Sequence, residues 1–134
     1  LHAVAEQARH QHGAQQVVAV LDARMDEVYA AHLHWEQDRW HTESGPVLAA
    51  PEHIHAPAGW TVAGNAQAAY PTRLAPNAEH VRALPTAAAL LRLAPALLAA
   101  GQDVDANGAM PLYLRDKVAQ TTAEREALRM GKPA

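Results

Sequence analysis

The chain has 134 residues, no cysteine, 49% hydrophobic residues, 19% charged residues and a formal net charge of −3. This size and composition predict one globular domain and do not match the low hydrophobicity of disordered proteins. The lack of cysteine excludes disulfides and cysteine metal sites, and it favours a reducing, cytoplasmic compartment. The net charge argues against a surface that coats nucleic acid, and the longest apolar run, residues 93–100, is too short to span a membrane.

The first half of the chain predicts one helix followed by three strands. Residues 2–12 have a helical composition and end at Gly13, a typical helix C-cap. Residues 17–21 form a short β-branched run, which is typical of a strand buried on both faces of a sheet. Apolar and polar side chains alternate over residues 27–35, a polar turn follows, and residues 40–44 predict a third, antiparallel strand.

The second half predicts shorter elements and then a long helix. Prolines 46, 51 and 57 are expected to break the chain and leave room for one short helix over 52–55. Residues 60–63 predict a strand that Gly64 closes, 66–70 a helical turn, and 80–84 a further strand. Thr86 is the expected cap of a helix that runs to Gly101. Helical spacing predicts a core-facing stripe on it: Leu90, Leu93, Ala94, Leu97 and Leu98.

This order of elements predicts an α/β fold with a mixed sheet flanked by helices. After the first helix, the string β-β-β-α-β-α-β-α is the layout of a ribonuclease-H-like domain, the unit that is duplicated in actin-like ATPases. The charges divide the chain further. Residues 1–110 carry 6 basic and 11 acidic side chains, whereas residues 111–134 carry 5 basic and 3 acidic ones. A mildly basic C-terminal tail is therefore predicted from residue 111.

Acidic residues after the first predicted strand raise the alternative of a metal-dependent nuclease. Nucleases of this fold hold two divalent ions with carboxylates from several strands. Asp22 ends the first strand and Asp26 and Glu27 follow, but the later strands offer only Asn65 and Glu79, which are poor metal partners. The competing interpretation is that Asp22 caps a tight turn and the other two carboxylates are solvated or paired with an arginine.

Other patterns give weaker signals for metal or nucleotide binding. His32 and His34 share one strand face and, with His41 from the next strand, form a candidate metal site. The preferred interpretation is that these are surface histidines on a solvent-facing sheet. There is no His-Glu-x-x-His, phosphate-binding loop or Gly-x-Gly-x-x-Gly, and Asn65 in the turn at 63–66 is expected to cap the next helix. We therefore predict no catalytic residue, no bound metal and no cofactor.

Three stretches carry a more specific pattern. Residues 21–29 read LDARMDEVY and resemble the DARM-x-EVY signature of the TsaB (YeaZ-type) family of tRNA threonylcarbamoyladenosine biosynthesis proteins. Residues 111–119 read PLYLRDKVA and resemble that family's P-x-YLR-x-x-VA element. Residues 60–64 resemble the strand–glycine segment between them, so the resemblance extends over most of the chain.

The resemblance implies an actin-like protein of two subdomains that acts without catalysing a reaction. It implies binding to the paralogue TsaD, which transfers threonylcarbamoyl to the adenosine next to the tRNA anticodon, together with the ATPase TsaE. It also implies homodimers, contact with tRNA only through the complex, and a cytoplasmic location away from membranes. An older name for the superfamily is glycoprotease-like (peptidase M22), but this sequence lacks the metal-ligand motif that peptidase activity would need.

The family's N-terminal subdomain, with its G-P-G-S-F-T-G-x-R loop, has no counterpart in this sequence. The resemblance therefore implies that residues 1–110 are the C-terminal subdomain with a lead-in helix, and that residues 111–134 are a tail that packs back on it. Residues 121–124 resemble a capping box, which leaves two alternatives for the end of the tail: a short helix over 122–130, or disorder.

The matched residues predict architecture and not catalysis. Asp22 and Arg24 are expected to fix the hairpin between the first two strands. Glu27 has two alternative partners, Arg24 and, from the tail, Arg115. Tyr29 is expected on the apolar face of its strand.

Two further matched positions concern the later strand and the tail. Gly64 is expected to close the strand over 60–63, and Tyr113 and Leu114 to lay the tail back over the domain.

Overall fold

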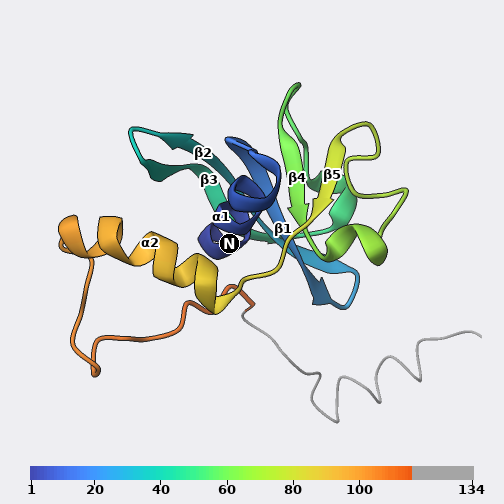
Figure 1. Cartoon of the computed structure of the whole chain (residues 1–134). Helices are drawn as coiled ribbons and strands as arrows, with labels where there is room; N and C mark the ends of the chain where they lie inside the picture. Colours follow the sequence, from blue (N-terminus) through green and yellow to red (C-terminus); the bar gives the residue numbers. More distant parts are fainter. Residues whose placement is uncertain (116–134) are drawn as a thin grey trace, which may run out of the picture.

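A computed structural model describes residues 1–115. These residues form the following elements in chain order (Figure 1): α1 (His2–His12), β1 (Gln16–Arg24), β2 (Glu27–Glu36), β3 (Arg39–Ala49), the 3-10 turn η1 (Pro51–His53), β4 (Thr61–Gly64), the 3-10 turn η2 (Ala66–Ala68), β5 (Glu79–Arg82) and α2 (Ala87–Ala99). The predicted helices at 52–55 and 66–70 are thus single 3-10 turns. Within the described residues, no helix is long and apolar enough to cross a lipid bilayer.

The strands form one mixed sheet in the order β3-β2-β1-β4-β5. β1 pairs antiparallel with β2, with Val18 opposite His32, and β2 pairs antiparallel with β3. β4 lies parallel to β1 on its other side, and β5 lies parallel to β4. A three-strand meander is therefore extended by two parallel strands, which need crossover connections. This arrangement confirms the predicted α/β fold with a mixed sheet.

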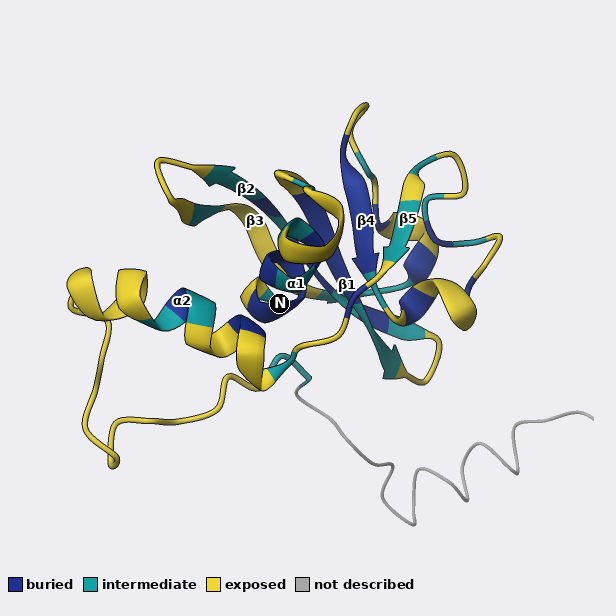
Figure 2. Ribbon diagram, viewed as in Figure 1, coloured by how far each residue is buried: buried dark blue, intermediate teal, exposed yellow. Residues whose placement is uncertain are grey.

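The central strand β1 is buried on both faces, as its run of β-branched residues predicts. Val18 and Val20 face one apolar core, which includes Trp60 and Leu74. The alternate residues face a second core, where the buried side of α1 packs on the sheet. Figure 2 shows the buried residues concentrated in β1, β4 and the adjoining side of α1. The sheet is thus covered on both faces, which is usual for α/β proteins.

The third strand is longer than predicted, because Pro46 does not end it. β3 continues to Ala49, and its pairing with β2 shifts register on both sides of His32. β3 is an edge strand, and proline is tolerated there and at bulges because no partner needs its missing N–H. Gly45 precedes the proline at φ 92, and a Cβ atom there would lie 2.7 Å from the backbone oxygen of Ala30.

Helix α2 begins as predicted but faces the core differently. The Thr86 hydroxyl caps it by accepting a hydrogen bond from the Ala89 backbone nitrogen at 3.1 Å. Only Ala89 and Leu93 are buried, in a small cluster with Ala3 of α1.

The predicted core-facing stripe of α2 is therefore wrong for most of its members. Among them, three leucines remain 43–60% exposed: Leu90, Leu97 and Leu98. The physical reason is that α2 is apolar on every side except at Arg92. Hydrophobic spacing identifies an inward face only when the opposite face is polar.

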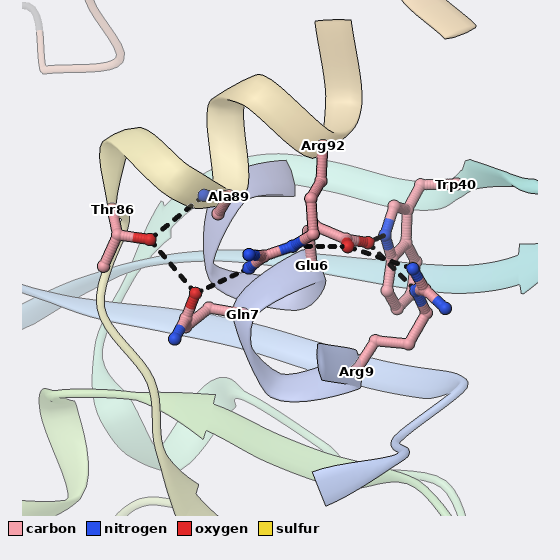
Figure 3. A network of polar contacts seen from close by, with 7 residues as sticks. All are labelled: Glu6, Gln7, Arg9, Trp40, Thr86, Ala89 and Arg92. Atoms are coloured by element: carbon pink, nitrogen blue, oxygen red, sulfur yellow. Dashed lines mark hydrogen bonds and ion pairs between the residues drawn. The ribbon is translucent and has the colours of Figure 1, made fainter. Parts of the chain in front are cut away.

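A buried carboxylate connects α1 with β3 and α2 (Figure 3). The Glu6 side chain is only 1% exposed. Its Oε2 accepts hydrogen bonds from Arg9 Nε and from Trp40 Nε1, and its Oε1 accepts one from Arg92 Nε, each at 3.0 Å. Arg92 also donates to Gln7 Oε1 at 2.8 Å. This network is the main polar link between the two helices.

The Glu6 network predicts acid sensitivity of the fold. Burial alone would raise the pKa of Glu6, but hydrogen bonds from Arg9, Trp40 and Arg92 hold the pKa below its ordinary value of 4.5. A carboxylate with a lowered folded-state pKa stabilises the fold above its unfolded-state pKa, and this contribution is lost as the pH falls through the folded-state pKa.

We therefore expect the free energy of unfolding of the unchanged chain to fall as the pH drops below about 4.5, and Glu6→Gln to flatten that part of the curve. Urea unfolding at a series of pH values measures both curves. Parallel curves for the two proteins in the acid range would contradict the assignment.

Candidate functional site at the β1–β2 hairpin

The residues with the most specific sequence pattern meet at the tight hairpin between β1 and β2. β1 ends at Arg24 and β2 begins at Glu27. Arg24, Met25 and Asp26 have φ angles of 63°, 56° and 64°. Residues other than glycine rarely adopt this left-handed region, and a run of three needs support from the surrounding structure. The contacts to this hairpin therefore decide its shape.

Asp22 supports the inner side of the hairpin. Its Oδ1 accepts hydrogen bonds from the Arg24 backbone nitrogen at 2.9 Å and from the Tyr70 hydroxyl at 3.2 Å. Burial, together with the Asp22 charge, raises the pKa of Tyr70, which keeps the hydroxyl protonated as a donor. The Arg24 guanidinium lies 3.7 Å from Asp22 Oδ2 but is 87% exposed. Asp22 thus fixes the hairpin mainly through the backbone of Arg24.

Asn65 has a different role from the predicted helix cap. It occupies the N-cap position of η2, but its side chain makes no capping hydrogen bond. Its Oδ1 instead accepts a hydrogen bond from the Asp22 backbone nitrogen at 2.9 Å. Asn65 therefore ties the end of β4 to the end of β1.

Gly64 allows β4 to approach β1 closely. It lies opposite Val20 in the parallel pairing of the two strands and has a φ of 149°. A Cβ atom at this position would overlap the backbone oxygen of Val20. Both the close approach to Val20 and the positive φ angle therefore require glycine at position 64.

Arg73 supports the outer side of the hairpin and was not singled out by any sequence pattern. Its Nη1 donates to Asp26 Oδ1 at 2.8 Å, and its Nη2 donates to Glu52 Oε2 at 2.9 Å. Its guanidinium also lies 5.5 Å from the centre of the Tyr70 ring. Arg73 and Tyr70 come from the irregular stretch between η2 and β5, which offers no periodicity from which their roles could be predicted.

Arg115 reaches the same hairpin from the other end of the described chain. Its Nη2 lies 2.8 Å from Glu27 Oε2 and donates to the backbone oxygens of Ala23 at 3.0 Å and of Arg24 at 3.3 Å. The Arg115 side chain is only 10% exposed. Of the two alternative partners for Glu27, the structure therefore has Arg115.

The segment before Arg115 packs unevenly on the sheet. Leu112 and Leu114 line an apolar hollow of about 430 Å³ together with Leu21 and Tyr29, so Tyr29 lies on an apolar face as expected. Tyr113, by contrast, is 79% exposed and does not pack the tail on the domain, which corrects the prediction for this residue. The last motif residues, 116–119, and the stretch 122–130 lie outside the described residues.

The acidic residues of the hairpin do not share one site. Asp22 accepts from Tyr70, Asp26 pairs with Arg73, and Glu27 pairs with Arg115. Among residues 1–115, no group of three or more His, Asp or Glu side chains is placed to hold a metal ion. In this part of the chain, the geometry thus gives the nuclease alternative no support.

The candidate histidines on β2 also have separate surroundings. His32 Nε2 lies 2.7 Å from the backbone oxygen of His55, and the His32 ring packs against Trp60. The His34 ring stacks on His41, with ring centres 5.1 Å apart. His32 and His34 are half-buried, so the description of a solvent-facing sheet is wrong for them.

Replacing Arg115 and Glu27 singly and together tests whether the tail stabilises the hairpin. We expect a coupling free energy of about 1 kcal/mol, measured by urea unfolding in a double-mutant cycle of Arg115→Ala and Glu27→Gln. Arg24→Ala is the matched control. Because this side chain is mostly exposed, its removal should lower the free energy of unfolding less than Arg115→Ala does. A coupling indistinguishable from zero would show that the contact does not stabilise the hairpin.

Comparisons with known proteins agree with the fold and with the family that the sequence resembles. No protein-family model matches the chain. The chain is 32% identical over 126 residues to tRNA threonylcarbamoyladenosine biosynthesis protein TsaB of Escherichia coli (strain K12), an alignment that covers 87% of this chain and 54% of that protein.

Two solved structures from Pseudomonas aeruginosa are similar at 34% identity. The structure of YeaZ has a TM-score of 0.77 and matches 85% of this chain and 56% of its own. The structure of an uncharacterized protein with similarity to peptidase YeaZ has a TM-score of 0.76 and matches 86% of this chain and 56% of its own. The chain thus spans about half the length of the relatives it matches.

Proposed function

Because the chain belongs to the TsaB/YeaZ family over the part that it spans, we propose that it acts in the biosynthesis of threonylcarbamoyladenosine in tRNA. The observation that carries this proposal is the alignment with the E. coli protein of that name. Because the alignment covers 87% of this chain, it includes the hairpin between β1 and β2.

In the proposed role the chain is part of a non-catalytic, cytoplasmic subunit. Three carboxylates of the hairpin are bound by neighbouring side chains of the same fold. Asp22 accepts a hydrogen bond from Tyr70, whereas Asp26 and Glu27 form ion pairs with arginines. Each of these pairings stabilises the hairpin itself, as expected of residues that shape a surface for another protein. This arrangement favours a subunit that presents a fixed surface to a partner.

We place the partner contact at the tip of the hairpin. The side chain of Arg24 is 87% exposed, and Met25 is 63% exposed. The contacts of Asp22, Arg73 and Arg115 hold the backbone beneath them. A rigid tip that presents one cation and one apolar side chain suits docking to another protein. The proposed partner is TsaD, with TsaE in the same complex, and tRNA is reached only through that complex.

The proposal includes a division of the longer protein into two subdomains. In it, the described residues correspond to the second subdomain and the relatives' additional length to the first. The activity of the whole protein then belongs to the complete subunit and not to this chain by itself.

Capture by TsaD tests the proposed role. The segment of E. coli TsaB that aligns with this chain is replaced by the chain, and the hybrid is passed over immobilised TsaD beside E. coli TsaB itself. We expect the hybrid to be retained and Arg24→Glu in it to reduce retention at least tenfold. Met110→Glu is the matched control, because Met110 is also exposed but is not part of the hairpin. A folded hybrid that is retained no better than an unrelated protein would contradict the proposal.

A further inference from the structure

A groove lies between α2, the start of α1 and the turn that joins β2 to β3. Figure 1 shows that α2 and this turn both extend to the left of the view. The groove has a volume of about 910 Å³, which is within the range of small-molecule sites in proteins. None of its lining residues belongs to the hairpin between β1 and β2. Its apolar lining residues include Trp35 and Trp40 of the sheet and, from α2, Leu90, Leu93, Ala96 and Leu97.

The apolar wall of this groove is held in place by contacts within the fold. The Trp40 indole nitrogen donates a hydrogen bond to Glu6 Oε2 at 3.0 Å (Figure 3), and the Trp40 ring meets the edge of the Trp35 ring with centres 5.5 Å apart. Leu93 is only 8% exposed and packs in the small cluster against which Trp40 also lies. A ligand therefore meets a wall that is already ordered, which lowers the entropic cost of binding.

Arg39 supplies a positive charge at the sheet side of the groove. The tight turn before it consists of Gln37 and Asp38, with φ angles of 52° and 60°, so Arg39 is the first residue of β3. Its Nε donates a hydrogen bond to His41 Nε2 at 3.1 Å, and both residues line the groove. The His41 ring is in turn stacked on His34. These contacts orient the guanidinium and leave its two terminal nitrogens without a hydrogen-bond partner among residues 1–115.

The neighbouring carboxylates do not neutralise Arg39. Glu36 and Glu43 lie 3.9 Å and 3.1 Å from ring nitrogens of His34 instead. Asp38 is the one acidic residue that lines the groove, and within the described residues it forms no ion pair with Arg39. The groove thus combines an apolar wall with an arginine that can accept a negatively charged ligand.

The second arginine of the groove is already occupied. Arg92 donates to Glu6 Oε1 at 3.0 Å and to Gln7 Oε1 at 2.8 Å (Figure 3). Its charge therefore holds α2 on α1, whereas Arg39 is exposed and open to a ligand. The position of an anionic group in the groove is thus determined by Arg39.

We propose that this groove binds a small amphipathic carboxylate. The carboxylate pairs with Arg39, whose terminal nitrogens can bind both carboxylate oxygens at once. The apolar body lies along Leu90 and Leu97, which are two helical turns apart, or about 10 Å along the axis of α2. A cationic ligand would be repelled by Arg39, and a neutral one would leave the guanidinium unused. The inference does not depend on the proposed role in tRNA modification.

An NMR titration of the full 134-residue chain with octanoate tests the site. We expect the backbone amide signals of α2 and the indole N–H signal of Trp40 to shift, with a dissociation constant on the order of 1 mM, as is usual for a ligand of this size. Octan-1-ol has the same apolar chain without the charge and should bind at least fivefold more weakly. Octanoate that leaves these signals unchanged, or octan-1-ol that binds as tightly, would overturn the proposal.

Single substitutions locate the two ends of the ligand. Arg39→Gln should raise the dissociation constant of octanoate at least fivefold and leave that of octan-1-ol unchanged. Arg24→Gln is the matched control, because Arg24 is 87% exposed and does not line the groove.

Leu90→Gln should weaken the binding of both compounds, whereas Leu91→Gln should weaken neither, because Leu91 is 74% exposed but does not line the groove. All four positions are exposed, so the circular dichroism spectra should stay unchanged. Equal effects of Arg39→Gln and Arg24→Gln, or of Leu90→Gln and Leu91→Gln, would overturn the assignment.

Discussion

Gly64→Ala is expected to lower the free energy of unfolding by at least about 3 kcal/mol, the range reached when a substitution forces a backbone clash in a core. The added methyl group would overlap the backbone oxygen of Val20. Backbone atoms of a central strand cannot move aside as a flexible side chain can. The pairing of β1 with β4 must therefore open, and with it the attachment of Asn65 to Asp22.

Gly13→Ala separates this clash from the cost of backbone conformation. Gly13 also has a positive φ, 72°, but a Cβ atom there would have no neighbour within 4 Å. We expect this control to cost about 1 kcal/mol, from conformation alone. Urea unfolding of the two variants measures the difference. Equal losses at the two positions would refute the clash at Gly64.

Glu6→Ala is expected to destabilise the chain by about 3 kcal/mol, because removing one partner of a buried ion pair leaves the others without compensation. The Arg92 guanidinium and the Trp40 indole nitrogen would both lose their carboxylate acceptor. The loss should be largest in the docking of α2 on α1, since these contacts are the polar link between the two helices.

Glu52→Ala is the matched control for Glu6→Ala. Glu52 also pairs with an arginine, Arg73, but its side chain is 48% exposed. Water solvates the charges of an exposed ion pair, so the pair adds little stability. We therefore expect little change in the free energy of unfolding. Chemical unfolding and hydrogen exchange in α2 measure both variants. A Glu6→Ala protein as stable as the Glu52→Ala protein would contradict the role of the Glu6 network.

Those parts of the fold that depend on local sequence could be predicted. The strand β1 follows from its β-branched run, and the hairpin after β2 follows from alternation that ends in polar residues. The inward face of α2 could not be predicted, because all its sides but one are apolar. The continuation of β3 through Pro46 depends on that strand lying at the edge of the sheet, a property that only the assembled sheet has.

The residues of the hairpin itself could be predicted, whereas most of the residues that support it from elsewhere in the chain could not. The motif at the hairpin identified Asp22 and Glu27 and left two alternative partners for Glu27. The choice of Arg115 depends on a contact between residues that lie far apart in the sequence. Arg73 and Tyr70 approach from an irregular stretch whose path is fixed by the packed core, and no local pattern indicates such a path.

The most direct test of the proposed role is the threonylcarbamoyladenosine content of tRNA. E. coli cells depleted of their own TsaB would carry the hybrid in which this chain replaces the aligned segment. Mass spectrometry of digested tRNA then measures the modified nucleoside. The proposal predicts that the hybrid maintains the modification and that Arg24→Glu in it reduces the modification. A folded, expressed hybrid that leaves the modification at the depleted level would contradict it.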